Sequence, residues 1–235
     1  MTQPPTAAPQ SPAKAGHSAV LAVVWDFGGV ITSSPFEAFR RFELEHGLPV
    51  DFLRQVNSQN HLDNAWARFE RSQLDLDAFD QAFADESAAL GHSVRGREVV
   101  ALLSGQIRPS MVAALKTLRT RLKIGLITNN MRAPGNLHGE AGAASAPSER
   151  AAVVALFHHV IESAEVGIRK PDPAIYQMMC DALQVAPPQA VFLDDLGVNL
   201  KPARAMGMHT IKVGEPGPAL AQLQALVGFD LGAGV

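Results

Sequence analysis

The sequence predicts an α/β fold, in which a doubly wound parallel sheet carries a helical insertion after its first strand. Two observations lead to this fold class. Apolar strand-like segments alternate with amphipathic helical segments along most of the chain, which is the order of βαβ units. The segment 33–105 breaks this alternation, because it contains several helical patterns and no good strand pattern. With 235 residues, of which 47% are hydrophobic and 18% charged, the chain can bury the core that such a fold needs.

The chain is expected to become ordered near Ser18. Residues 1–18 are rich in Pro, Ala, Gln and Ser, which predicts a disordered N-terminal arm. Residues 19–27, AVLAVVWDF, form an apolar run with one carboxylate near its end, and two glycines follow it. Such a run is typical of a parallel strand that is covered on both faces. We therefore expect the first strand of the sheet here.

The insertion at 33–105 is predicted to be helical and to have its own core. Its first helix begins after Ser34-Pro35, a second covers 62–69, and Asp75 caps a third. Seven of the eleven Phe residues of the chain lie in this insertion at helical spacing. Phe residues in this pattern more often pack against one another than contact a ligand. We interpret the insertion as a small helical cap.

The remaining strands and helices alternate, as a doubly wound sheet requires. The four strand patterns are short and apolar: 123–129, 158–163, 190–195 and 209–213. Helices are predicted from three local signals: a start at Arg108-Pro109-Ser110, an Asp172 cap before Pro173, and a short apolar pattern over 200–206 that Gly207 ends. The segment 131–148 is rich in Gly, Ala, Ser and Pro, and we expect a long mobile loop there.

Polar side chains follow several of the predicted strands, at the edge where ligands bind in a doubly wound sheet. They are Asp26, Thr128, Asn129, Lys170, Asp194 and Asp195. The three aspartates would place a charge of −3 in one crevice, which destabilises a fold unless cations balance it. A divalent cation and Lys170 would supply +3, and oxygen-only ligands favour Mg²⁺. A phosphate dianion would then bind to the metal, to Lys170, to the Thr128 hydroxyl and to nearby backbone N–H groups.

Four segments, in this order, resemble the motifs of the haloacid dehalogenase (HAD) superfamily: WDFGGVIT, LITNN, GIRKPDPAIY and VFLDDLGVNLKPARAMGM. The last is similar to the phosphatase-type domain of soluble epoxide hydrolase and to the corresponding domain of acyl-CoA dehydrogenase fusion proteins. The resemblance implies a Rossmann-like core over 19–32 and 106–235, with the cap at 33–105. It also implies a Mg²⁺-dependent phosphomonoester hydrolase that acts on a small organic phosphate through an aspartyl-phosphate intermediate.

The resemblance assigns roles to the acidic residues. Asp26 matches the nucleophile that accepts the phosphoryl group. The metal ligands would be Asp26, the backbone carbonyl of Gly28 and Asp195. Asp194 matches a carboxylate that supports the metal site and the lysine, and Asn199 matches a polar residue that supports the metal-binding loop.

The remaining roles concern the phosphoryl group. Thr128 and Asn129 match the pair that binds the phosphate. Lys170 matches a lysine that steadies both the nucleophile and the phosphoryl group, so it counts as catalytic and as phosphate-binding.

Gly28 departs from the phosphatase pattern, which has an aspartate two residues after the nucleophile. That aspartate protonates the leaving group, and such help typically contributes ~10²–10⁴ in rate. Three alternatives stay open. In the first, another group such as Glu37 or His61 replaces the missing aspartate. In the second, the substrate has a good leaving group. In the third, turnover is slow or absent.

Two functions other than a phosphatase are considered. A non-catalytic module that binds metal and phosphate is the second hypothesis, and Gly28 is its main support. A haloacid dehalogenase is less favoured, because carbon–halogen displacement needs no Mg²⁺ and the Asp194-Asp195 pair then has no purpose. The sequence does not determine the substrate.

Overall fold

The computed structural model describes residues 19–103, 105–130 and 148–232. Five parallel strands form one sheet in the order β3-β2-β1-β4-β5. They are β1 (Ala22–Trp25), β2 (Lys123–Thr128), β3 (His159–Glu162), β4 (Ala190–Asp194) and β5 (His209–Lys212). The chain builds outward from β1 to β3, returns across β1 to β4 and continues to β5, so the sheet is doubly wound. The predicted fold class is confirmed.

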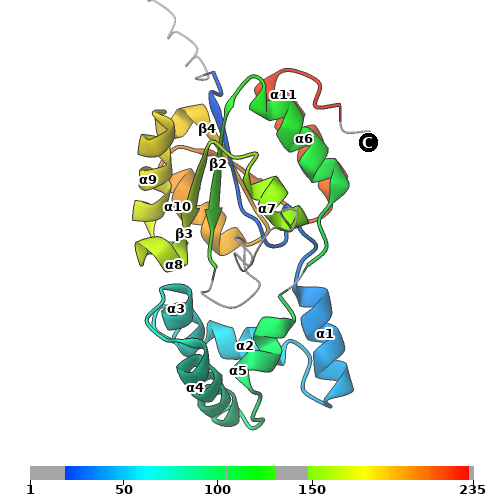
Figure 1. Ribbon diagram of the computed structural model, residues 1–235, viewed down its shortest axis with the longest axis vertical. Helices are drawn as coiled ribbons and strands as arrows, with labels where there is room; N and C mark the ends of the chain where they lie inside the picture. Colours follow the sequence, from blue (N-terminus) through cyan, green and yellow to red (C-terminus); the bar gives the residue numbers. More distant parts are fainter. Residues whose placement is uncertain (1–18, 104, 131–147, 233–235) are drawn as a thin grey trace, which may run out of the picture.

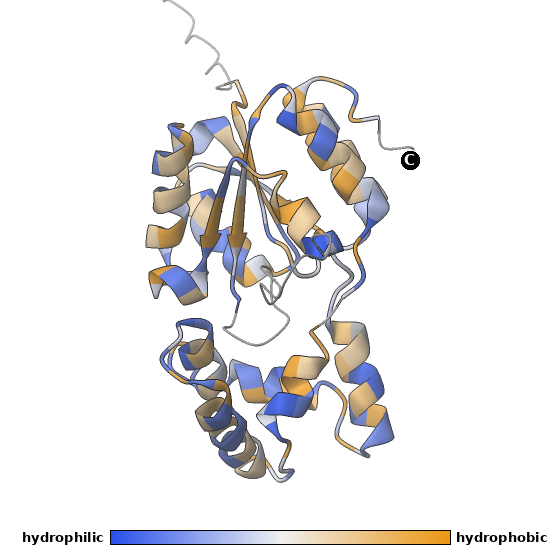
Figure 2. Ribbon diagram, in the orientation of Figure 1, coloured by the Kyte–Doolittle hydropathy of each residue, from blue (hydrophilic) through white to orange (hydrophobic). Residues whose placement is uncertain are grey.

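Helices cover both faces of the sheet (Figure 1). One face packs against α6 (Pro109–Arg119), α7 (Glu149–Val154) and α11 (Pro216–Val227). The other packs against α9 (Pro173–Leu183) and α10 (Gly197–Ala205). In Figure 2 the strands are mostly hydrophobic, whereas the long helices carry residues of both kinds.

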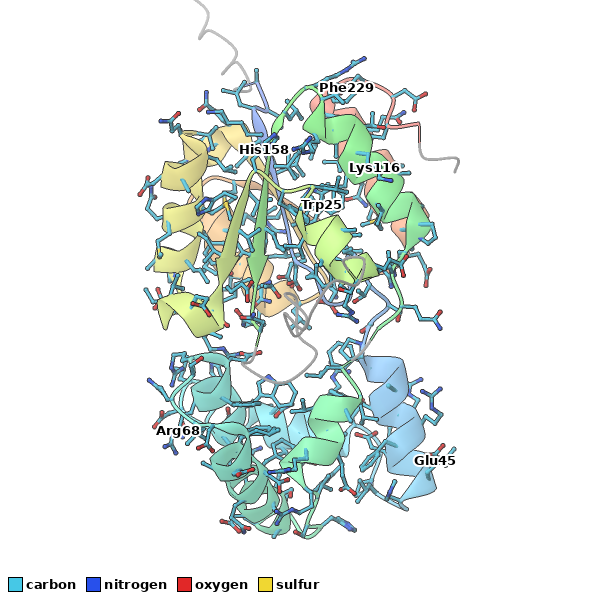
Figure 3. The ribbon with its side chains drawn as sticks, viewed as in Figure 1. Trp25, Glu45, Arg68, Lys116, His158 and Phe229 are labelled. Atoms are coloured by element: carbon cyan, nitrogen blue, oxygen red, sulfur yellow. The ribbon has the colours of Figure 1, made fainter. Side chains whose placement is uncertain are left out.

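The first strand explains why its sequence is apolar without alternation. Val23 and Trp25 belong to the apolar cluster on the α6 face, and Ala22 and Val24 belong to the cluster on the α9 face. All four side chains are fully buried, as expected of a central parallel strand. Figure 3 shows Trp25 within the interior of this core.

The residues between β1 and α6 form a separate group of helices, which we name the helical unit (residues 36–101). Its helices are α1 (Phe36–Glu45), α2 (Phe52–Ser58), α3 (Ala65–Glu70), α4 (Leu76–Ala88) and α5 (Gly96–Ala101). It has its own apolar cluster, in which six of its seven Phe residues are buried. In Figure 1 it lies beyond the arrowheads of the strands, which are their carboxyl ends.

Some predicted boundaries were wrong. The helix predicted over 62–69 begins at Ala65, because the Asn64 side chain caps it by accepting a hydrogen bond from the Ala67 N–H. The helix predicted over 200–206 begins at Gly197, directly after the turn that follows β4. Within the described residues, five α-helices were not predicted: α2, α5, α7, α8 (Ser163–Val166) and α11.

Two expectations cannot be compared with the structure. The N-terminal arm at 1–18 lies outside the described residues, and so does the predicted loop at 131–148 apart from its last residue. Among the helices of the described ranges, none combines the length and the apolar character needed to cross a membrane.

Candidate active site

Lys170 is the centre of the site, and its position explains how the acidic residues are held. Its Nζ lies 2.8 Å from Asp26 Oδ1 and 2.8 Å from Asp194 Oδ2, and it donates to the Ile127 carbonyl at 3.0 Å. The side chain is only 1% exposed. Burial by itself lowers the pKa of Lys170, but the charges of Asp194 and Asp26 outweigh burial and hold this pKa above its ordinary value. The ammonium group is therefore charged at neutral pH.

Asn129, which follows β2, fixes the backbone of Lys170. Its Nδ2 donates to the Lys170 carbonyl at 3.0 Å, and its Oδ1 accepts from the Lys170 N–H at 2.9 Å. The side chain was expected to belong to the phosphate-binding pair, whereas the structure has it joining β2 to the segment before α9. Asn129 also lines the cavity described below, so its backbone N–H and the second N–H of its side-chain amide are the donors it could offer to a phosphate.

Asp194 is fully buried and accepts four hydrogen bonds. Its Oδ1 accepts from the Leu196 N–H at 2.8 Å, and Asn199 Nδ2 lies 3.0 Å from both carboxylate oxygens. Lys170 provides the fourth bond. Asp194 therefore holds Lys170 and the turn after β4, and it does not line the cavity described below.

Tyr176 supports this arrangement and was not predicted, although it lies within one of the recognised motifs. Its hydroxyl donates to the Asn199 carbonyl at 2.7 Å. Burial raises the pKa of Tyr176 above its ordinary value, so the phenol stays protonated and remains a donor. The signal that could have identified it is a tyrosine within an apolar helical stripe, because a buried tyrosine hydroxyl usually finds a hydrogen-bond partner.

The three aspartates lie close together. One carboxylate oxygen from each of Asp26, Asp194 and Asp195 is within 4.8 Å of the others. Burial is the main cause that raises the pKa of Asp26 to about 7, although Lys170 opposes it. Burial, followed by the charge of Asp194, raises the pKa of Asp195 to about 6. Lys170, and at Asp195 also Arg108, oppose these increases in pKa but do not cancel them.

The turn after Asp26 places two glycines in different situations. Gly29 has φ +75°, which strains any larger residue, and a Cβ there would lie 2.3 Å from Asp195 Oδ2 and displace that carboxylate. Gly28 has no such constraint, because a Cβ at this position would meet no atom within 4 Å. The absence of a side chain at Gly28 is therefore not required by the packing. Arg108 holds the turn from behind, since its Nη1 donates to the Gly29 carbonyl at 3.0 Å.

A cavity of about 840 Å³ opens between the carboxyl ends of the strands and the helical unit. Its polar floor contains Asp26, Thr128, Lys170 and Asp195. Its apolar wall comes mainly from the helical unit and includes Phe36, Phe39, Trp66, Val100 and Leu103. His61 also lines it, whereas the side chain of Glu37 lies outside the described part of the molecule. His158 lies at the other end of the sheet, away from the helical unit (Figure 3).

The helical unit is bound to the core beside Lys170, through contacts that the sequence did not reveal. Glu70 Oε2 lies 2.6 Å from Arg169 Nε, and Ser163 Oγ donates to the Glu70 carbonyl at 2.7 Å. Ser72 Oγ donates to the Ala164 carbonyl at 2.9 Å. Burial raises the pKa of Glu70, although Arg169 opposes this. These contacts place α3 against the residue that precedes Lys170.

Comparisons with known proteins identify related sequences. A family model described as haloacid dehalogenase-like hydrolase matches residues 20–207. Acyl-CoA dehydrogenase family member 10 of Mus musculus is 33% identical over 94% of this chain and 20% of its own length. Bifunctional epoxide hydrolase 2 of the same species is 29% identical over 89% of this chain and 39% of its own length. The chain thus spans well under half of these two relatives, and the resemblance drawn from the motifs is confirmed.

A relative of similar size and a solved structure complete the comparison. Phosphatase MT3486 of Mycobacterium tuberculosis is 29% identical over 84% of this chain and 89% of its own length. A HAD family enzyme of Bacteroides thetaiotaomicron, solved in complex with magnesium and inorganic phosphate, superposes with a TM-score of 0.57. It is 17% identical and covers 87% of this chain and 99% of its own, so this likeness concerns the fold.

Proposed function

Because the chain belongs to the haloacid dehalogenase-like hydrolase family, we propose that it is a Mg²⁺-dependent phosphatase, which hydrolyses a small organic phosphate monoester through a phosphorylated Asp26. The observation that carries this proposal is the convergence of Asp26, Asp194 and Asp195 on the buried ammonium of Lys170. The relative named as a phosphatase supports the same reaction class. Residues 33–105 are proposed as a cap over the core formed by 19–32 and 106–235.

The donor set of the site fits Mg²⁺. The candidate ligands are all oxygens, from Asp26, Asp195 and the Gly28 carbonyl, and Mg²⁺ prefers such ligands together with water. Burial raises the pKa values of the two carboxyl groups because it disfavours their charged forms, and a bound divalent cation would stabilise those forms. When bound, Mg²⁺ would supply the charge that allows an anionic phosphate to approach a carboxylate. A fold relative is described with the same ion and with phosphate, which supports this choice.

The protein groups then have distinct tasks in the proposed reaction. Asp26 Oδ1 is held by Lys170 Nζ at 2.8 Å and by the Phe27 N–H at 2.7 Å, so Oδ2 is the oxygen proposed to attack phosphorus. The Thr128 hydroxyl and the Asn129 N–H are proposed to bind the phosphoryl oxygens. The P–O bond to the leaving group breaks as Asp26 is phosphorylated, and the departing alkoxide takes a proton from solvent. Water then hydrolyses the acyl phosphate, which releases inorganic phosphate and regenerates the Asp26 carboxylate.

A second candidate function is a module that binds metal and phosphate without turnover. The observation that favours it is Gly28, which offers a carbonyl to a metal but no acid for the leaving group. Among the described residues, no atom other than those of Gly28 and its chain neighbours lies within 4 Å of the point where a Cβ of residue 28 would be.

The test is a panel of phosphate esters assayed with Mg²⁺, with EDTA, and with Asp26→Asn. We expect turnover by the unmodified protein with Mg²⁺ and its loss in both other conditions. Turnover that survives Asp26→Asn would contradict the proposed nucleophile. No turnover of any ester, together with Mg²⁺-dependent binding of inorganic phosphate, would establish the second candidate instead.

A further inference from the structure

Arginine side chains on the cavity carry charge that the proposed chemistry does not use. Besides Lys170, the cationic residues that line the cavity are Arg54, Arg150 and Arg169. Arg169 is paired with Glu70. Arg54 lies 3.5 Å from Asp51, in an exposed pair. Across the described ranges, Arg150 has no carboxylate within ion-pair distance.

The surroundings of Arg150 make its lack of an anionic partner costly. It lies in the first turn of α7, half-buried, with its guanidinium carbon 5.6 Å from the centre of the Phe27 ring. Its Nη2 donates to the Gly105 carbonyl at 2.7 Å. Burial lowers the pKa of Arg150, because desolvation disfavours the charged form and no nearby anion opposes it. A partly desolvated guanidinium with unused donors is well suited to a planar carboxylate or a phosphate.

The position of the guanidinium indicates which part of a substrate it would meet. Lys170 lies on the polar floor of the cavity, where the reacting phosphoryl group is proposed to bind. Arg150 instead approaches from α7 and contacts Gly105, two residues after Leu103 of the apolar wall. The guanidinium therefore lies where the floor meets that wall, beside the space available to the alcohol part of a phosphate ester.

We propose that Arg150 binds a second anionic group, a carboxylate or a further phosphate, carried by the alcohol part of the substrate. The inference rests on the proposed function, because it takes the reacting phosphoryl group to lie at Asp26. It narrows the substrate class to organic phosphates with a second negative charge beyond the scissile group.

The test measures binding, so that it does not depend on turnover. Calorimetry with Mg²⁺ would compare alkyl phosphates with ω-carboxyalkyl phosphates of equal chain length, over a series of lengths, using protein that carries Asp26→Asn. We expect the carboxylated member to bind more tightly at the best chain length. Adding Arg150→Gln should reduce this preference by about 10- to 100-fold, the usual effect of one charged hydrogen-bonded pair.

Two further variants separate the proposed role from a structural one. Arg150→Lys keeps the charge and should retain part of the preference. Arg119→Gln is the matched control, because Arg119 also donates to a single backbone carbonyl, that of Leu156 at 2.8 Å, but does not line the cavity. It should leave the preference unchanged.

Three outcomes would overturn the inference. The first is no preference for the carboxylated series before Arg150 is changed. The second is an equal loss for both series in Arg150→Gln, which would assign Arg150 to the reacting phosphoryl group or to stability. The third is no binding of either series. Failure of the proposed function is seen separately, as absence of turnover by the unmodified protein while the binding preference persists.

Discussion

Gly28 is the residue where a side-chain acid is missing and where the structure has room for one. The variant Gly28→Asp should therefore fold, and its carboxyl group should protonate leaving alcohols. We expect kcat for alkyl phosphates to rise by about 100-fold, the low end of the ~10²–10⁴ range of general acid catalysis, and kcat for esters of acidic phenols to change little.

The same esters provide the control for this prediction. In the unmodified protein, kcat should fall steeply as the leaving-group pKa rises, because no side chain protonates the alcohol. Gly28→Asn has nearly the same size and no acid, so it should not raise kcat. A flat dependence before mutation, or an equal gain from Asn, would show that the acid is supplied elsewhere.

Lys170 compensates two buried carboxylates, so its charge should be needed for stability as well as for chemistry. Lys170→Met keeps much of the side-chain volume and leaves Asp26 and Asp194 uncompensated. We expect a loss of about 3–5 kcal/mol in the free energy of unfolding at neutral pH, measured by denaturant titration. The loss should shrink as pH falls below the pKa of Asp26, about 7, because a protonated Asp26 no longer needs the charge of Lys170. An unchanged stability at neutral pH would contradict the charge assignment.

For single residues, the sequence predicted which side chains lie close together but not which hydrogen bonds each of them makes. Strand ends in a parallel sheet converge, so Asp26, Asp194 and Lys170 were predicted to share a site. The partner of a side-chain amide depends on distances below an ångström, which no sequence pattern contains. The sequence therefore did not predict the two hydrogen bonds between the Asn129 side chain and the Lys170 backbone. Nor did it predict the hydrogen bond from the Tyr176 hydroxyl to the Asn199 carbonyl.

At the scale of helices and strands, the contact of α3 with the core should affect both substrate binding in the cavity and stability. Glu70→Gln would remove the ion pair with Arg169, the residue next to Lys170, and keep the shape of the side chain. We expect KM to rise more than kcat falls, and stability to drop by roughly 1–3 kcal/mol, because Arg169 is left partly buried without its anion. Steady-state kinetics and denaturant titration measure both effects.

The matched control for Glu70→Gln is Asp77→Asn, which breaks an exposed ion pair with Arg97 inside the helical unit. Exposed pairs contribute little, so neither KM nor stability should change appreciably. If both variants behave alike, the Glu70–Arg169 pair has no special role in holding the helical unit on the core.

Element prediction succeeded where the local signal was strong. The strands β1, β2 and β4 are mostly apolar runs, and α9 begins at the predicted Asp172 cap, which accepts a hydrogen bond from the Ala174 N–H. The missed helices α2, α5 and α7 have only six or seven residues, too few to display a helical hydrophobic period. The contact of α3 with the core joins residues about a hundred positions apart, and no local pattern encodes it.

For the whole molecule, the acidic site should link stability to pH and to Mg²⁺. The pKa values of Asp26 and Asp195, about 7 and about 6, exceed their ordinary value of 3.8. Between pH 3.8 and about 7, the metal-free folded protein binds more protons than the unfolded chain. The free energy of unfolding should therefore fall as pH rises from 3.8 to about 7. Mg²⁺ binds the deprotonated carboxylates and should reverse the loss.

Thermal unfolding with and without saturating Mg²⁺ checks this linkage. The increase in Tm caused by Mg²⁺ should be clearly larger at about pH 8 than at about pH 5, where protons compete for the same oxygens. Asp195→Asn should reduce the increase at the higher pH. An equal Tm increase at both pH values would contradict metal binding at these carboxylates.

The most direct measurement of the central claim is a crystal structure of the protein grown with Mg²⁺ and inorganic phosphate. The account predicts an ion bound to Asp26, Asp195 and the Gly28 carbonyl at oxygen distances of about 2.0–2.1 Å, with the phosphate beside Lys170 and Thr128. Density for the ion at another place, or its absence from this crevice at saturating Mg²⁺, would contradict the account.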